Sequence, residues 1–166
     1  MKKIIKHSVI LIFIITLLSC SKSDDSSSSS LSFTALIDGE NFEAREDLIF
    51  ALEINKVYLS VGGTNDNFKN TKTIDFTIDA SITNVIETGT VMTDSNQNFD
   101  VLANYVDFDE DINAWSDETG GSYYIKITKI DYEKELVSGE FKFTLVDDDL
   151  NESFEITDGV FKNVPF

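Results

Sequence analysis

The stretch Ile74-Asp75-Phe76-Thr77-Ile78-Asp79 decides the fold class, because apolar and polar side chains alternate strictly along it. Successive side chains of a β-strand point to opposite faces, so this pattern is typical of a strand with one buried and one solvated face. Six further runs show the same period, with apolar positions Phe33/Ala35/Ile37, Leu48/Phe50/Leu52/Ile54, Val57/Leu59/Val61, Tyr123/Ile125/Ile127, Phe141/Phe143/Leu145 and Phe154/Ile156. Residue types that prefer strands dominate all of these runs.

Turn-forming residues separate the runs. Pairs containing glycine fall at or between run ends, at Asp38-Gly39, Gly62-Gly63, Gly120-Gly121 and Asp158-Gly159. Proline is absent before Pro165, and only Ser81–Glu87 fits even one short helical turn. We therefore predict an all-β domain over residues 31–166. Its expected architecture is an antiparallel β-sandwich or partly open barrel of about eight to nine strands.

The beginning of the chain has the pattern of a lipoprotein signal peptide. Met1–His7 carries three lysines and no acid, and Ser8–Leu18 is almost wholly apolar but too short for a membrane-spanning helix. Leu17-Leu18-Ser19-Cys20 follows, and it resembles the bacterial lipobox. That resemblance implies cleavage after residue 19 and lipidation of Cys20. The alternative is an ordinary secreted protein with a stray cysteine, but the only cysteine of the chain lies where the lipobox needs it.

Cleavage and lipidation would leave little of the usual metal and nucleophile chemistry. His7 is the only histidine and Cys20 the only cysteine, so the mature chain would contain no imidazole and no free thiol. The full chain has 13 basic and 30 acidic residues, a net charge of -17. Loss of Lys2, Lys3 and Lys6 leaves 10 basic residues against 30 acidic ones, a net charge of -20. Such acidity argues against nucleic acid as a partner.

A polar segment follows the lipidation site. Ser21–Ser30 consists of serine, aspartate and one lysine, so it cannot bury apolar area, and we expect residues 20–30 to form a lipidated, flexible tether. Asp24-Asp25 resembles the acidic export signal of Bacteroidota surface lipoproteins. A solvating charge pair is the alternative interpretation. We expect an outer-membrane protein held by its lipid anchor, and the acidic pair favours a surface-facing position over a periplasm-facing one.

Several segments of the mature chain carry a wider resemblance. They are Phe33–Phe42, Gly121–Tyr123, Ile127–Asp131, Val137–Phe143 and Ile156–Phe166. In these segments the chain is similar to a family of Bacteroidota (flavobacterial) outer-membrane lipoproteins of unknown function. The usual Gly-Thr-Phe of that family is Gly139-Glu140-Phe141 here, which we interpret as a surface change on an edge strand. The family has no known activity, so the resemblance implies a fold and a location but no site.

One acidic segment is a candidate metal site. Asp107, Asp109 and Asp111 are spaced two apart, and Glu118 lies eleven residues after Asp107. Oxygen ligands at positions 1, 3, 5 and 12 of a loop suit Ca²⁺. Position 6 is Ile112 rather than glycine, and the flanks have a strand pattern, so the segment is not an EF-hand. An irregular calcium loop and a solvated acidic loop both remain open, and the second is the commoner outcome. Weaker versions of the pattern occur at Asp94–Asp100 and Asp147–Glu152.

Two function classes remain. The first is a non-catalytic cell-envelope lipoprotein, a binding or structural module whose extracellular or periplasmic ligand the sequence does not identify. The second is a carboxylate-dependent hydrolase acting on a polysaccharide, which a groove with two carboxylates about 5–10 Å apart would favour. Trp115, Tyr123 and Tyr124 could contact a sugar face, but aromatic side chains of β-sandwiches are mostly core residues. We expect the first class and no enzyme.

Overall fold

The computed structural model describes residues 30–65, 70–80, 84–96 and 98–166. The signal peptide, Cys20 and nearly all of the tether lie outside these residues. The described chain consists mostly of strands and contains one short 3-10 helix, η1 (Glu46–Leu48). Its strands are β1 (Ser32–Ile37), β2 (Glu40–Glu43), β3 (Ile49–Ile54), β4 (Tyr58–Thr64), β5 (Lys72–Ala80), β6 (Val91–Thr93), β7 (Phe99–Asp107), β8 (Ile112–Trp115), β9 (Ser122–Asp131), β10 (Leu136–Asp147) and β11 (Glu152–Pro165).

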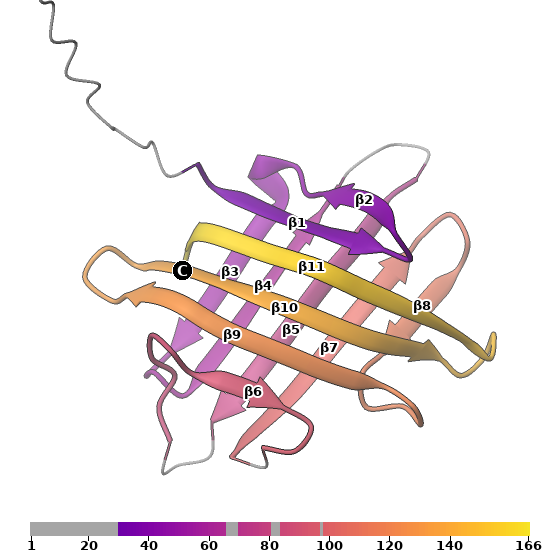
Figure 1. The fold of residues 1–166 in the computed structure, drawn as a ribbon. Helices are drawn as coiled ribbons and strands as arrows, with labels where there is room; N and C mark the ends of the chain where they lie inside the picture. Colours follow the sequence, from indigo (N-terminus) through magenta and orange to yellow (C-terminus); the bar gives the residue numbers. More distant parts are fainter. Residues whose placement is uncertain (1–29, 66–69, 81–83, 97) are drawn as a thin grey trace, which may run out of the picture.

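The strands form two crossing layers of one curled antiparallel sheet (Figure 1). The sheet order is β2-β1-β11-β10-β8-β7-β5-β4-β3. In the front layer, β9 pairs with β10 on the side opposite β11, and β6 pairs with β9. The layers join where β8 meets the end of β10, through the pair Val146 and Trp115. The predicted all-β sandwich or partly open barrel is thereby confirmed. The strand number exceeds the expectation because β2, β6 and β8 have only three or four residues each.

A cluster of phenylalanine rings fills the space between the layers. Phe76 of β5, in the back layer, lies with its ring centroid 5.7 Å from each of the Phe141, Phe143 and Phe161 rings of the front layer. Phe33 of β1 extends the cluster and lies 5.1 Å from Phe141. All five side chains are at most 2% exposed. Tilted aromatic contacts at these distances stabilise the fold beyond the effect of their large buried area. This cluster is therefore the main packing contact between the layers.

Two glycines make room for the rings within the front layer. Gly139 of β10 lies opposite Phe161 of β11, and Phe141 of β10 lies opposite Gly159 of β11. A Cβ on Gly159 would stand 2.5 Å from the Phe141 ring, and a Cβ on Gly139 would stand 2.3 Å from the Phe161 ring. Each ring therefore covers the bare backbone of the facing strand. The two pairs lie two residues apart in unbroken register, which places both rings on the inner face, and the register shifts only beyond Phe141, where Asp158 has a φ of 50°.

Three hairpins of the sheet share one turn design. An aspartate ends the first strand, at Asp107 (β7), Asp131 (β9) and Asp147 (β10), and its carboxylate accepts hydrogen bonds from backbone N–H groups two or three residues later. The residue four positions after each aspartate has a left-handed φ of 54–57°, at Asp111, Glu135 and Asn151. Aspartate is suited to this place because its short side chain can bond the turn that follows it.

The structure corrects the expected orientation of β3. The sequence pattern assigns Phe50, Leu52 and Ile54 to a buried face, yet all three are exposed. The hairpin register places Ala51 opposite Val61, and the fully buried Leu59 and Val61 set the inner face of β4. Facing residues of an antiparallel pair share a side of the sheet, so the inner row of β4 turns the more apolar row of β3 outward.

Two smaller expectations also change. Strand β10 is an interior strand, paired with β11 on one side and with β9 and β8 on the other, so Glu140 is a surface residue on an interior strand rather than an edge strand. Residues 84–87 of the expected helical turn contain no helix, and residues 81–83 lie outside the described chain. The short helix η1 occurs elsewhere, where Arg45 hydrogen-bonds Asp47 beside the chain reversal between β2 and β3.

The aromatic cluster makes a stability prediction. Phe143→Ala should lower the free energy of unfolding of the mature chain by about 3–5 kcal/mol, because the change removes a buried ring and leaves a cavity beside Phe76. Urea denaturation followed by circular dichroism measures this value, with the exposed Glu140→Ala on the same strand as the control. A loss below about 1 kcal/mol would contradict the central position of Phe143.

Candidate functional site

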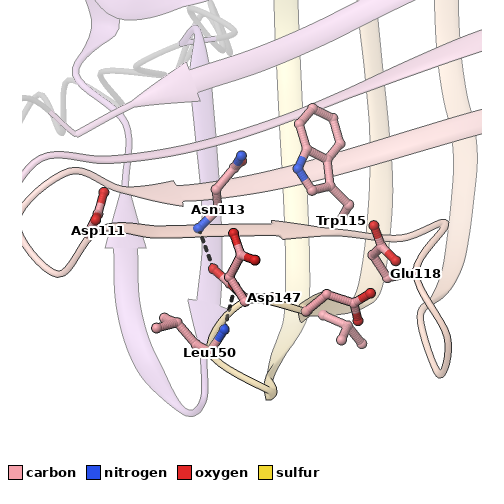
Figure 2. A pocket seen from close by; sticks show the side chains of 9 residues that line it. Asp111, Asn113, Trp115, Glu118, Asp147 and Leu150 are labelled. Carbon is pink, nitrogen blue, oxygen red and sulfur yellow. Dashed lines mark hydrogen bonds between the residues drawn. The ribbon is translucent and has the colours of Figure 1, made fainter.

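A hollow in the described surface lies where the two layers join (Figure 2). It is an open depression of about 480 Å³ between β8, the turn that follows it and the β10–β11 hairpin. Acidic side chains dominate its lining, which consists of Asp111, Asn113, Trp115, Glu118, Val146, Asp147, Asp148, Asp149 and Leu150. Residues from 111–118 and 146–150 meet here because β8 runs beside the end of β10.

Asp147 fixes the floor of the depression. Its carboxylate accepts hydrogen bonds from the Asn113 N–H at 2.7 Å and from the Leu150 N–H at 3.0 Å, which ties β8 to the β10–β11 turn (Figure 2). These backbone donors, Asn113 first, lower the pKa of Asp147 below its usual value. Asp147 is only 4% exposed because its own turn covers it. Burial raises the pKa of Asp147, but the backbone hydrogen bonds outweigh this effect.

The other acids of the depression are much more open to solvent. Glu118 and Asp148 approach each other from the two sides, and a side-chain hydrogen bond between them raises the pKa of Glu118. Repulsion by the Asp148 carboxylate acts in the same direction. Asp111 and Asp149 are exposed on the flanking turns. The site is therefore one rigid, backbone-bonded carboxylate surrounded by solvated acids.

The structure separates the predicted calcium ligands. Asp107 is 2% exposed, and its carboxylate lies 3.5 Å from the Lys72 ammonium and 3.4 Å from the Tyr105 hydroxyl. The Asp109 carboxylate accepts a hydrogen bond from the Thr71 N–H. Asp111 and Glu118 are the two members that line the depression. They stand at opposite ends of β8, so the four residues are not gathered on one loop.

Metal-ligand geometry does not arise elsewhere in residues 30–166 as far as the structure describes them. Within that part of the chain, no three side chains of His, Cys, Asp or Glu come close enough together to hold a metal ion. Asp107 instead interacts with residues of the fold. Burial and the negative charge of Asp107 both raise the pKa of the Tyr105 hydroxyl. The ion pair with Lys72 joins the ends of β7 and β5.

The aromatic candidates divide between core and site. Tyr123 packs against the core, as the sequence analysis favoured, and its N–H donates to the Asp94 carboxylate at 2.9 Å. Trp115 is half-buried and lines the depression, so it does more than cover a strand end. Tyr124 lies on the outer face of the front layer in a smaller hollow with Lys142 and Glu140. The three residues therefore do not form one aromatic surface.

One further acid is perturbed, on the outer face of the back layer. Burial raises the pKa of Asp75 to about 6. Asp75 belongs to a cross-strand row that runs from Phe50 through Gly62, Asp75 and Asn104 to Trp115. The Phe50 ring covers Gly62 and reaches toward Asp75, since a Cβ on Gly62 would meet both side chains. This row connects the exposed edge strand to the depression across the entire layer.

The chain belongs to the family described as Domain of unknown function (DUF6252), whose model matches residues 29–165. The match spans every strand of the described fold and stops just short of Phe166. No curated protein matches the chain significantly. No solved structure matches it significantly either. Membership in this family therefore defines the domain without assigning a chemistry. No helix in the described residues is both long and apolar enough to cross a membrane.

The sequence identified part of this site. It singled out the segments Asp107–Glu118 and Asp147–Glu152 separately, on their acidic content. It did not predict that they are neighbours, because their contact depends on the register of β8 beside β10. The usable signal was the shared spacing of an aspartate at a strand end and a turn residue four positions later, which marks both segments as hairpins.

The role of Asp147 is testable by comparison with its neighbour. Asp147→Ala should lower the free energy of unfolding by about 1–2 kcal/mol, because the Asn113 and Leu150 N–H groups lose their acceptor. Its depressed pKa stabilises the fold above the unfolded pKa of about 4, and that contribution is lost as the pH falls through the folded value. Urea denaturation at pH 7 and pH 3 measures both effects. Asp149→Ala is the matched control, and an equal loss in both variants at pH 7 would contradict the assignment.

Proposed function

We propose that the protein is a non-catalytic cell-envelope lipoprotein, anchored in the outer membrane through Cys20 and acting as a binding or structural module. One observation carries the non-catalytic part of this proposal. The two least exposed carboxylates of the described residues, Asp107 and Asp147, both accept hydrogen bonds from N–H groups of their hairpin turns, and Asp147 also accepts one from the Asn113 N–H of β8. A general acid or base must exchange its proton with a substrate, whereas these two carboxylates serve the backbone.

The depression supports the same proposal. Two of its acids, Glu118 and Asp148, approach each other from the two sides of the depression, and the Asp148 carboxyl raises the pKa of Glu118. Glycosidases hold their two carboxyl groups about 5 Å apart or more, which leaves room for the sugar or for a water molecule. In the described residues, neither Glu118 nor Asp148 accepts a backbone hydrogen bond that would fix its carboxyl group at such a separation, and Asp148 is exposed. The depression is also open and strongly polar, unlike the deep, mostly apolar pockets that bury small ligands.

The arrangement of the chain supports the anchor. Strand β1 begins at Ser32, eleven residues after Ser21, so the polar tether separates the lipidation site from the domain. A flexible tether of ten residues spans roughly 20 Å on average, which would hold the domain close to the bilayer. Three acyl chains on Cys20 would exceed the two signals needed for stable anchoring. The proposal places the domain on the cell surface, with Asp24-Asp25 as the export signal, and requires no cofactor.

Lipidation and display can be tested in one set of cells. Wild-type protein should incorporate labelled palmitate and partition into detergent, and Cys20→Ala should do neither. Proteinase K added to intact cells should degrade the wild-type domain. Replacement of both Asp24 and Asp25 by alanine should protect the domain from the protease without removing the label. Labelling of Cys20→Ala would contradict the anchor, and equal protection of wild type and the aspartate variant would contradict surface display.

A further inference from the structure

The edge strand β3 differs from the other edges of the sheet. Among the described strands it pairs with β4 alone, so on its other backbone side no described strand is hydrogen-bonded to it. The edge strand β2 has only four residues and a glutamate at each end, and β6 has only three residues. Short, charged edges resist pairing with another chain. Strand β3 has six residues in unbroken register, no proline and one charged residue, Glu53.

Both faces of β3 are apolar. Ile49 and Ala51 pack against the core on the inner face. On the outer face, Phe50 is 44% exposed, Leu52 52% and Ile54 46%. A strand that is apolar on both faces is typical of the interior of a sheet, where both faces are covered and both edges are paired. The residue composition of β3 therefore suits a strand with a second neighbour.

We propose that β3 pairs antiparallel with β3 of a second copy of this chain, around a two-fold axis that passes beside Leu52. In this register Leu52 lies opposite Leu52 of the other copy, and Phe50 lies opposite Ile54. All exposed apolar side chains of the strand then meet an apolar partner across the interface. Cross-strand pairs of this kind stabilise sheets, and a self-complementary patch is what a two-fold dimer requires. The pairing would also give hydrogen-bond partners to the backbone N–H and C=O groups on the unpaired side of β3 in each copy.

Charge complements the same register. Leu48, the last residue of η1, lies opposite Lys56, the second residue of the β3–β4 turn. Asp47 and Glu46 stand one and two residues before Leu48, so in this register they lie near Lys56 of the other copy. Within its own chain, the Lys56 ammonium lies 4.6 Å from the centre of the Tyr132 ring, and Asp47 pairs with Arg45. A chain with a net charge near -20 repels its own copies in general. At this edge, two Lys56 side chains and a nearly uncharged strand reduce that repulsion. The inference concerns the folded domain and does not depend on the lipid anchor.

Single cysteines test the register directly in the full-length protein in membranes. Across a two-fold axis, Leu52→Cys places two thiols in a facing pair, with Cα atoms about 4.5–5.5 Å apart and within disulfide range. Ile54→Cys is the matched control on the same face, because its two copies would stand four positions apart along the strand, about 13 Å. Mild oxidation should give a disulfide dimer at least tenfold more abundant for Leu52→Cys than for Ile54→Cys. Wild type reports any contribution from Cys20.

A second measurement addresses the association without oxidation. Sedimentation equilibrium of the mature chain carrying Cys20→Ser should show a dimer, and adding Leu52→Lys should make it monomeric, because two ammonium groups would meet on the axis. Leu102→Lys, at another exposed leucine of the same layer, should leave the dimer intact. A monomeric Cys20→Ser chain at high concentration would overturn the proposal, as would equal crosslinking at positions 52 and 54. If the Cys20→Ser chain is monomeric and binds lipid vesicles, and Leu52→Lys abolishes that binding, the face belongs to lipid instead.

Discussion

Two phenylalanine rings on neighbouring strands each lie over a glycine of the other strand, and the remaining architecture is arranged around them. Phe141 covers Gly159, and Phe161 covers Gly139. The rings can lie flat against backbone because neither glycine carries a Cβ. This close packing lets Phe76 of the opposite layer contact Phe141, Phe143 and Phe161 at once. A domain whose residues 31–166 contain neither histidine nor cysteine thus obtains its stability from aromatic packing between two layers.

The same layers define where the molecule can interact with others. They join at one place, where β8 meets β10, and the acidic depression lies on that junction. The back layer ends at the opposite side with β3, whose apolar row faces outward. A continuous cross-strand row links the two places, from Phe50 to Trp115. A binding or structural module needs distinct surfaces of this kind more than it needs a deep pocket.

The sequence predicted the fold class because period two is a local property of each strand. The buried rows around Phe33, Phe76 and Phe143 are confirmed for this reason. The face of β3 was predicted wrongly, because two apolar rows compete along that strand and the hairpin register with β4 decides between them. The interior position of β10 was also missed, since strand order depends on long-range pairing.

The candidate site shows the same limit. Acidic content marked Asp107 and Asp147, but it did not show that backbone N–H groups bind both carboxylates. It also could not bring Glu118 to Asp148, because that contact joins two hairpins across the β8–β10 junction. The proposed pairing of β3 could not be predicted from the sequence either. The alternation of Phe50, Leu52 and Ile54 suggests a partner only once the structure shows that these side chains face outward.

A double-mutant cycle on Gly159 and Phe141 tests the central interaction most directly. All three nearest neighbours of a Cβ on Gly159 are atoms of the Phe141 ring, so Gly159→Ala introduces one defined clash. In the wild-type background, this change should lower the free energy of unfolding by about 1–3 kcal/mol. In a Phe141→Leu background it should cost at least about 1 kcal/mol less, because the smaller side chain yields. Additive losses in the two backgrounds would contradict the account.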